Sequence, residues 1–459
     1  MLYRKIIKKL EDWRTNPGRK PLILRGARQV GKTTVVNEFG RQFKHYISLN
    51  LEKSEDASFF KAYGDDVKDI FDAVLLSRNA PYDPENTLVF IDEIQEVPRA
   101  VALLRYFYED LPGLNVIAAD SLLEFALGEL GSFPVGRVLQ MSVHPMDFEE
   151  FLHAAGEKMA LEYYQKTPVP DIAVDKLLRL FNQFIIIGGM PEVVAAYFDN
   201  NQTIASLPDI YSSIWDNYKD DIEKYSHSNK ERRILRHILD VAPGIRDRIT
   251  FNGFGNSSYT SKDIGDAFRT LHKTGLIRLI YPTNELKIPL KPNYRRKPRI
   301  QFLDTGLLNF AAGIQARLLK LEDLNQYFKG YIVNHMVFQE HLAQTKRINQ
   351  LPYFWTREKA NSNAEVDWVV PFRELIYPVE IKSGASGRLR SLMEFIEKSE
   401  HQTGFRLLAN KFSRENLKTA KGKKINLINL PYFCGGRMEH YLEYLLEEWV
   451  GEEAFFAGN

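Results

Sequence analysis

The stretch PLILRGARQVGKTT, residues 21–34, decides the fold expected for the first part of this chain. It satisfies the pattern G-x-x-x-x-G-K-[ST], with an apolar strand before it and a helical pattern after it. In such a loop the glycines let backbone N–H groups converge on phosphate oxygens, and the start of the helix adds positive potential. We expect the nucleotide to contact Gly26, Ala27, Arg28, Gln29, Val30, Gly31, Lys32, Thr33 and Thr34.

Two residues of this loop carry specific expected roles. Lys32 would reach the β- and γ-phosphate oxygens of the nucleotide, and the Thr33 hydroxyl is placed to bind Mg²⁺. The alternative, a glycine turn without a ligand, does not account for a loop that lies between a strand and a helix. ATP and Mg²⁺ are therefore the expected cofactors.

The acids that such a loop requires occur in LVFIDEIQ, residues 88–95. Four apolar residues drive this stretch into a sheet and leave Asp92 and Glu93 at its carboxyl end, where open α/β sheets bind ligands. We expect Asp92 to hold Mg²⁺ through water and Glu93 to polarise the attacking water, which favours hydrolysis over kinase-type transfer. An acidic helix cap is the alternative interpretation.

Composition sets outer bounds on the protein. A chain of 459 residues exceeds one compact core, so two or three domains are expected. The net charge of +2 means that any nucleic-acid surface must come from local clustering. The single cysteine, Cys434, excludes a disulfide within the chain and a cysteine zinc site. The sequence lacks a signal peptide and an apolar run of the roughly 20 residues that a membrane span needs, which predicts a cytoplasmic protein without membrane contact.

The fold class expected is α/β, in three parts. Strands alternate with helical patterns in residues 1–150, which predicts an AAA-like domain with a parallel sheet and helices on both faces. Residues 151–299 are expected to form a helical lid and a winged-helix-like region. Residues 300–459 are expected to form a second α/β unit.

Within the middle part, residues 260–282 predict a capped helix, a stop at Gly275 and a strand, as in a winged helix. The helix would expose Lys262, Arg269 and Lys273. Two roles stay open for this segment: it reads bases, or it packs as a structural lid.

Nine stretches in chain order resemble the bacterial AAA-like ATPases in which a P-loop domain is joined to a C-terminal domain with a PD-(D/E)xK, restriction-endonuclease-like fold. These stretches are PLILRGARQVGKTT, FIDEIQEVP, SLLEFAL, FPVGRV, HPMDFEEFL, GGMPEVV, FLDTGLL, AEVDWVV and VEIKSG. The resemblance implies an ATP-hydrolysing domain and a nuclease-like domain in one chain.

The resemblance also assigns roles around the nucleotide. Arg137, in PVGRV, would contact the γ-phosphate in its own subunit or across a subunit boundary of a homo-oligomer, the alternative being a solvated loop arginine. Pro191, in GGMP, would close a helical lid over the adenine; a helix-breaking turn is the alternative. Asp120 departs from the pattern, because relatives carry a small residue there, and it either orients water or weakens hydrolysis.

In the C-terminal part the resemblance points to four residues. Glu380 and Lys382 are two apart on a strand and face the same side, and Asp367 lies within the apolar strand VDWVV. Glu340 lies on the apolar stripe of its helix. Asp367, Glu380 and Glu340 would hold Mg²⁺ or Mn²⁺, and Lys382 would position or deprotonate the attacking water. A domain that binds without cleaving is the alternative.

Basic clusters fit a nucleic-acid partner, with DNA preferred. They occur at residues 411–424, at residues 293–299, and at Arg388 and Arg390; solvated charged faces are the alternative. The sequence thus predicts an ATPase whose nucleotide cycle controls DNA binding and metal-dependent phosphodiester cleavage. The competing reading is an ATP-dependent switch with a non-cleaving, partner-binding C-terminal domain, and an ATP-driven protein remodeller is a weaker third.

Overall fold

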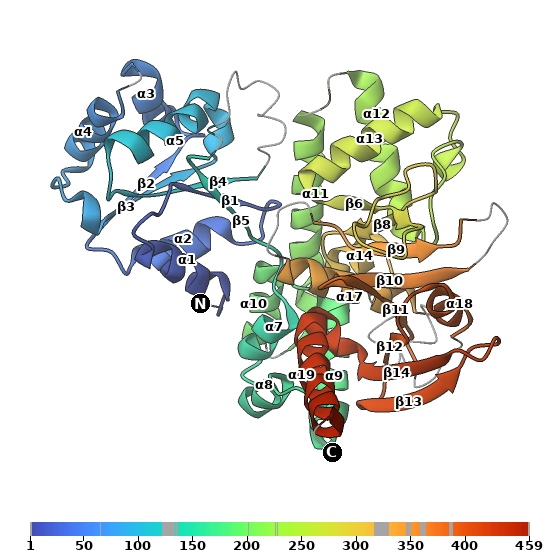
Figure 1. The fold of residues 1–459 in the computed structure, drawn as a ribbon. Coiled ribbons are helices and arrows are strands. Elements are labelled where there is room, and N and C mark those ends of the chain that lie inside the picture. Colours follow the sequence, from blue (N-terminus) through green and yellow to red (C-terminus); the bar gives the residue numbers. More distant parts are fainter. Residues whose placement is uncertain are drawn as a thin grey trace.

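The computed structural model describes the following residues, apart from the side chains of 223, 224 and 448–457: 2–64, 66–121, 134, 136–200, 202–224, 226, 228–315, 330–345, 350–358, 364–384 and 389–457. The N-terminal sheet and its helices form one lobe, and the rest of the chain forms a second (Figure 1).

The N-terminal sheet has five parallel strands in the order β2–β3–β4–β1–β5. The strands are β1 (Leu22–Arg25), β2 (His45–Asn50), β3 (Thr87–Asp92), β4 (Asn115–Asp120) and β5 (Leu139–Ser142). The helices are α1 (Ile6–Thr15), α2 (Lys32–Gly40), α3 (Ser54–Ala62), α4 (Val67–Arg78) and α5 (Pro98–Asp110). Leu22 and Leu24 pack with α1 and α2 on one face, and Ile23 packs with α3, α4 and α5 on the other. The predicted parallel sheet with helices on both faces is confirmed.

The middle of the chain is helical and rich in buried aromatic rings. Its helices are α7 (Phe148–Ala154), α8 (Lys158–Tyr164), α9 (Asp171–Ile187), α10 (Pro191–Asp199), α11 (Pro208–Lys224), α12 (Asn229–Val241) and α13 (Ser261–Thr274). Phe148 is fully buried, with ring centroids 4.9 Å from Phe181, 5.2 Å from Tyr164 and 6.3 Å from Phe433. Because Phe433 belongs to the C-terminal part, these rings join the middle helices to it.

The segment expected to resemble a winged helix forms the predicted elements. Thr260 caps α13 by accepting from the N–H of Asp263, and Gly275 ends the helix with a φ of 75°. Strand β6 (Ile277–Ile280) follows and pairs antiparallel with β8 (Arg299–Phe302) in a two-stranded sheet. The winged-helix assignment itself stays a prediction.

The C-terminal sheet has seven strands in the order β13–β14–β12–β11–β10–β9–β7. The strands are β7 (Pro282–Thr283), β9 (Tyr353–Thr356), β10 (Glu365–Phe372), β11 (Leu375–Ile381), β12 (Thr403–Leu408), β13 (Ser413–Lys418) and β14 (Lys424–Pro431). The helices are α14 (Thr305–Ala311), α17 (Tyr331–Gln344), α18 (Arg390–Lys398) and α19 (Met438–Ala457). Strands β9, β10 and β11 run antiparallel in succession, and α18 then leads to β12, parallel to β11. The boundary expected between 299 and 300 falls inside β8, and β7 from the middle part joins this sheet.

Short 3-10 helices complete the secondary structure, at Pro84–Asn86, Ile94–Glu96, Ile204–Ser206, Ala242–Gly244, Phe254–Asn256 and Tyr432–Arg437. Cys434 lies in the last of them, fully buried. Over the described ranges no single helix is long and apolar enough to cross a membrane; α9 and α10 would qualify only as a pair, which is bent by 118°.

The aromatic cluster predicts a specific loss of stability. We expect Phe148→Ala to lower the free energy of unfolding by about 3–5 kcal/mol, because it removes a fully buried ring and leaves a cavity. Chemical denaturation followed by circular dichroism measures this loss. The control Ile172→Ala truncates a side chain that is 79% exposed and should change stability by less than about 0.5 kcal/mol. An equally small change for Phe148→Ala would contradict the role of the cluster.

Candidate functional site

The phosphate-binding loop lies at the carboxyl end of β1 and leads directly into α2. Gly26 packs so closely on β5 that a Cβ there would collide with the carbonyl oxygen of Val143. Gly31 has a φ of 93°, a conformation that side chains other than glycine rarely adopt. Both glycines of the sequence pattern are therefore required by the backbone.

The Lys32 amine lies inside this loop. It is 6% exposed, and its Nζ donates to the carbonyl oxygens of Gly26 (2.9 Å) and Ala27 (3.0 Å). Burial lowers the pKa of Lys32, and the carboxylates of Glu93 and Asp120 oppose that shift. The ammonium is thus held among acids at the position predicted for phosphate contact.

Thr33 and Asp92 meet at the predicted magnesium position. The Thr33 hydroxyl donates to Asp92 Oδ2 at 2.8 Å. Burial raises the pKa of Asp92, while the hydrogen bond from Thr33 opposes that rise. A buried carboxylate beside a hydroxyl is a donor set that suits Mg²⁺, since the cation would offset the cost of burying the charge. These two residues fit the ion.

Glu93 follows Asp92 with a φ of 50°, and two side chains hold its carboxylate. Its Oε2 accepts from Gln95 Nε2 (2.6 Å) and from Ser121 Oγ (3.1 Å). Asp120 ends β4, opposite Arg25 in the register of β1, and is 2% exposed. Sequence reasoning missed Ser121, because a serine after a strand carries no signal of its own; the remainder of the SLLEFAL motif, residues 122–127, lies outside the described residues.

Arg4 is a second residue that sequence reasoning missed. Its guanidinium donates to the carbonyl oxygens of Val30 (2.8 Å) and His144 (2.7 Å) and pairs with Glu150. The side chain is 6% exposed, so α1 is tied to the phosphate-binding loop from inside the lobe. An amphipathic pattern does not show that one charged residue of the stretch is buried.

The helical region covers the other side of the loop. From α11, the Tyr218 hydroxyl donates to the carbonyl oxygen of Arg28 (2.7 Å), and Asp221 pairs with the Arg28 side chain (2.8 Å). Pro191, at the start of α10, lies beside Gly31, with its Cγ 3.6 Å from where a Cβ of Gly31 would be. Pro191 is therefore brought to the loop as expected, and its contact with a nucleotide stays a prediction.

Arg137 lies near the end of the same sheet that is opposite to the P-loop, where strands β1 and β5 begin. Leu139 pairs with Leu22 at the start of both strands, whereas the phosphate-binding loop leaves β1 at its carboxyl end. The Arg137 side chain is 53% exposed and pairs with Glu109 at 3.2 Å. Arg137 is thus not brought to the loop of its own chain. The contact across a subunit boundary stays a prediction, and the exposed side chain paired with Glu109 also fits the alternative of a solvated loop arginine.

In the C-terminal sheet, three of the four predicted residues converge. The antiparallel register pairs Trp368 with Val379, which puts Asp367 and Glu380 opposite each other on adjacent strands. Lys382 Nζ lies 2.8 Å from Glu380 Oε2 and 3.8 Å from Asp367 Oδ2. Burial and, after it, the charge of Asp367 raise the pKa of Glu380 to about 8, and Lys382 opposes that rise.

The structure contradicts the prediction that Glu340 is a metal ligand. Its Oε1 accepts from the backbone N–H of Phe148 (3.0 Å) at the start of α7, and the side chain is 1% exposed. The α17 residues beside Asp367 are instead Tyr331, Asn334, His335 and Phe338. Glu340 is two residues beyond Phe338, about 200° around the helix, so it faces away from the acid pair.

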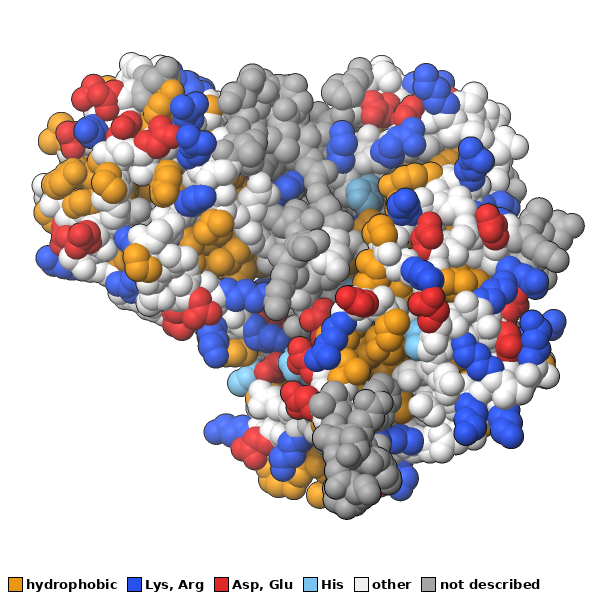
Figure 2. All heavy atoms as spheres, viewed as in Figure 1, with side chains coloured by type: hydrophobic (Ala, Val, Ile, Leu, Met, Phe, Trp, Pro, Cys, Tyr) orange, Lys and Arg blue, Asp and Glu red, His pale blue; other side chains and the backbone are white. Residues whose placement is uncertain are grey.

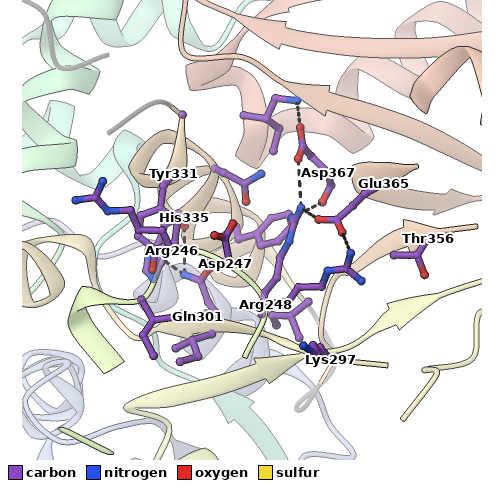
Figure 3. A pocket seen from close by; sticks show the side chains of 18 of the residues that line it. Arg246, Asp247, Arg248, Lys297, Gln301, Tyr331, His335, Thr356, Glu365 and Asp367 are labelled. Carbon is purple, nitrogen blue, oxygen red and sulfur yellow. Dashed lines mark hydrogen bonds and ion pairs between the residues drawn. The ribbon is translucent and has the colours of Figure 1, made fainter. Parts of the chain in front are cut away.

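A cavity of about 1020 Å³ opens beside Asp367 and Lys382, between the middle region and the C-terminal sheet. Figure 3 shows Asp367 and Glu365 on one wall, with Arg246, Asp247 and Gln301 across from them. Its basic lining residues are Arg246, Arg248, Arg295, Arg296, Lys297, Arg299 and Lys382, and its acidic ones are Asp247, Glu365 and Asp367. Seven positive side chains against three negative ones make this a site for an anionic ligand.

Among the described residues, the predicted basic cluster at 293–299 is the one that contributes to the lining of this cavity. In the cluster at 411–424, Lys411 pairs with Asp171, and Lys423 donates to the carbonyl oxygens of Ile396 and Ser399. Arg388 lies outside the described residues. Figure 2 shows Lys and Arg interspersed with Asp and Glu over both lobes, so the described side chains form no single basic patch on that face.

Asp367 and the nearby Glu365 already have cationic partners. Arg299 contacts Asp367 through its backbone oxygen (3.2 Å) and Oδ1 (3.4 Å), and it also pairs with Glu365. Arg248 holds the other oxygen of Glu365 at 3.0 Å. Among the described residues no group of three or more His, Cys, Asp or Glu side chains could hold a metal ion. Of the three predicted ligands of a second metal, the structure brings together only Asp367 and Glu380, and that metal stays a prediction.

Comparison with known proteins divides the chain in three. Residues 18–152 match an AAA domain, residues 178–318 match a domain of unknown function (DUF8612), and residues 329–433 match another (DUF4143). An uncharacterized protein of Methanocaldococcus jannaschii is 27% identical over 47% of this chain and 45% of its own length. One of Haemophilus influenzae is 25% identical over 63% of this chain and 69% of its own. The chain thus spans less than half of the first relative.

Two solved structures are more distant. A Walker-type ATPase of Pyrococcus abyssi is 15% identical, with a TM-score of 0.45 over 68% of this chain and 96% of that one. A signal transduction ATPase with numerous domains from Pyrococcus horikoshii is 12% identical, with a TM-score of 0.28 over 75% of this chain and 46% of that one. The assignment rests on the AAA-domain match together with the geometry of Lys32, Thr33 and Asp92. On these grounds, residues 18–152 are similar to an AAA domain and carry a P-loop.

Proposed function

We propose that this protein hydrolyses ATP at its P-loop and that the nucleotide controls the binding of nucleic acid, DNA in the first instance, in the cavity beside Asp367. The observation that carries this proposal is the cavity lining, in which seven basic side chains surround a space of about 1020 Å³. Six of the seven precede or begin β8, in the region that also covers the P-loop. One region of the chain thus borders both sites.

ATP hydrolysis follows from the side chains at the loop. The Lys32 amine would exchange the carbonyl oxygens of Gly26 and Ala27 for phosphate oxygens. Thr33 and Asp92 would hold Mg²⁺, which supplies positive charge against the leaving phosphates. Glu93, held by Gln95 and Ser121, would orient the water that attacks the γ-phosphate and take up its proton.

Binding of nucleic acid follows from the charge of the cavity. Arg and Lys side chains contact phosphates without reading base sequence, so affinity for the backbone is expected to depend steeply on salt. The fork of an arginine binds two phosphate oxygens at once. Arg246, Arg248, Arg296 and Lys297 all line the cavity and can contact a backbone that enters it.

Phosphodiester cleavage is a second candidate function, favoured by the convergence of Asp367, Glu380 and Lys382. Incubation of labelled DNA and RNA with Mg²⁺ or Mn²⁺, with and without ATP, tests it. Cleavage that Lys382→Ala abolishes would establish it. Binding without cleavage under all conditions would leave the non-cleaving switch, in which the cavity only holds the nucleic acid.

Lys32→Ala should abolish ATP binding while the fold is retained. The loop holds the Lys32 amine at its centre, and alanine removes this positive charge from the β- and γ-phosphates. Isothermal titration calorimetry with ATP and Mg²⁺ measures binding, and circular dichroism checks the fold. Tight binding by this variant would refute the assignment of the loop.

Glu93→Gln should bind ATP with unchanged affinity and hydrolyse it about 10²–10⁴-fold more slowly, because glutamine cannot take up a proton. Phosphate release under saturating ATP measures turnover. Glu96→Gln is the matched control, since Glu96 is an exposed acid three residues away and its loss should not alter the rate. Equal rates for the two variants would remove Glu93 from the mechanism.

Lys297→Ala should weaken binding of a DNA duplex and lower the slope of log affinity against log salt by about 0.9, as expected for one lost phosphate contact. Fluorescence anisotropy over a salt series gives both quantities. Lys411→Ala removes the same charge far from the cavity, where the lysine pairs with Asp171, and should leave both unchanged. If only Lys411→Ala weakened binding, the nucleic acid would lie on β13 and not in the cavity.

A further inference from the structure

The two-stranded sheet β6–β8 runs from the P-loop to the acidic residues Asp367 and Glu365. At one end lies Gly275, two residues before β6. A Cβ added to Gly275 would lie 3.6 Å from the Cβ of Ala27. The N–H of Leu303, just after β8, donates to the carbonyl oxygen of Leu276 (2.8 Å), which closes the ladder at this end. At the other end, Ile280 pairs with Arg299. One rigid element therefore contacts both sites.

Asp304 makes a second contact at the P-loop end. It follows β8 by two residues, is fully buried, and accepts from the N–H of Gly189 at 2.6 Å. Gly189 leads directly to Pro191, which lies beside Gly31. Asp304 is fixed in turn by Gln339 of α17 (3.0 Å). The carboxyl end of β8 is thus attached to the lid of the nucleotide site.

Arg299 lies at the other end of β8, five residues before Asp304, which spans about 17 Å in an extended strand. Its guanidinium contacts Asp367 and Glu365, both on β10. A displacement of β8 along or across its axis would therefore change these ion pairs directly.

The P-loop gives a cause for such a displacement. The Lys32 amine is bonded to the carbonyl oxygen of Ala27, and the Ala27 side chain touches Gly275. Phosphate oxygens that bind the amine would take it from this carbonyl, and the backbone at Ala27 would lose that hydrogen bond. Because packed interfaces have discrete arrangements and transmit small shifts, a resulting shift of this backbone would reach β6 and its partner β8.

We propose that Arg299 is a positioning residue that couples the nucleotide site to the nucleic-acid cavity: ATP at the P-loop moves the β6–β8 sheet and releases Arg299 from Asp367 and Glu365 to bind phosphates of the nucleic acid. This inference rests on the proposed function of the cavity. It makes the cavity a composite site, since the residue that responds to ATP comes from β8 and its acidic partners come from β10.

Fluorescence anisotropy of a labelled DNA oligonucleotide tests this coupling in the Glu93→Gln background, where ATP stays bound. We expect ATP to raise DNA affinity by at least about fivefold, and DNA to raise ATP affinity by the same factor, as linkage requires. Arg299→Ala should reduce this ratio to unity, and Arg299→Lys should restore part of it by keeping the charge. Lys297→Ala should lower the affinity for DNA and keep the ratio.

Hydrogen exchange without any nucleic acid separates the inference from the proposed function. We expect ATP to change the amide protection of residues 299–303 and 365–372 in the wild-type chain but to leave 365–372 unchanged in Arg299→Ala. If ATP changes the amide protection of these residues but the protein binds no DNA, the proposed function is refuted and the link from the P-loop through β8 to β10 is supported. DNA binding with an ATP ratio of unity and no change in exchange would overturn the inference and leave the proposed function standing.

Discussion

The buried carboxylate of Asp304 is the interaction that holds together the part of the second lobe that faces the P-loop. It accepts from Gly189, caps α14 through the N–H of Leu307, and is held by Gln339 of α17. Burial raises its pKa, while these hydrogen bonds oppose the rise. An acid without exposure to water is tolerated only when its oxygens are satisfied, so the lid loop, β8, α14 and α17 must stay in register with one another. That requirement positions the segment at Gly189, which is followed by Pro191 beside Gly31 of the P-loop.

The chain brings acidic side chains together in two different ways, one at the P-loop and one at the cavity. At the P-loop, Asp92 and Glu93 are adjacent in sequence, and the parallel sheet brings Asp92 to Thr33 across β4, which lies between β3 and β1. At the cavity, antiparallel pairing places Asp367 opposite Glu380, and Arg299 arrives from a different sheet. The first site is a property of one domain. The second exists only while the middle region and the C-terminal sheet are packed together.

This difference explains how much the sequence could predict. The loop at 26–34 and the acids at 92 and 93 were predictable, because a local pattern fixes both their conformation and their neighbours. The pair Glu380 and Lys382 was predictable from the alternation of a strand. Glu340 was misplaced, since its helix is buried on several faces and its apolar stripe does not say which face meets the acids. The sequence could not identify Arg4 and Arg299 as site residues. Only tertiary packing buries Arg4 against the P-loop and places Arg299 against Asp367.

The burial of Cys434 has a practical consequence for studies of motion in this protein. It is the single cysteine of the chain, it is fully buried beside Tyr441, and burial raises its pKa to about 12. Thiol reagents attack the thiolate, which is scarce at neutral pH in such a place. A cysteine introduced at an exposed position of either lobe would therefore be the one reactive thiol. Spectroscopic probes of lobe movement can be attached to the chain with its own cysteine left in place.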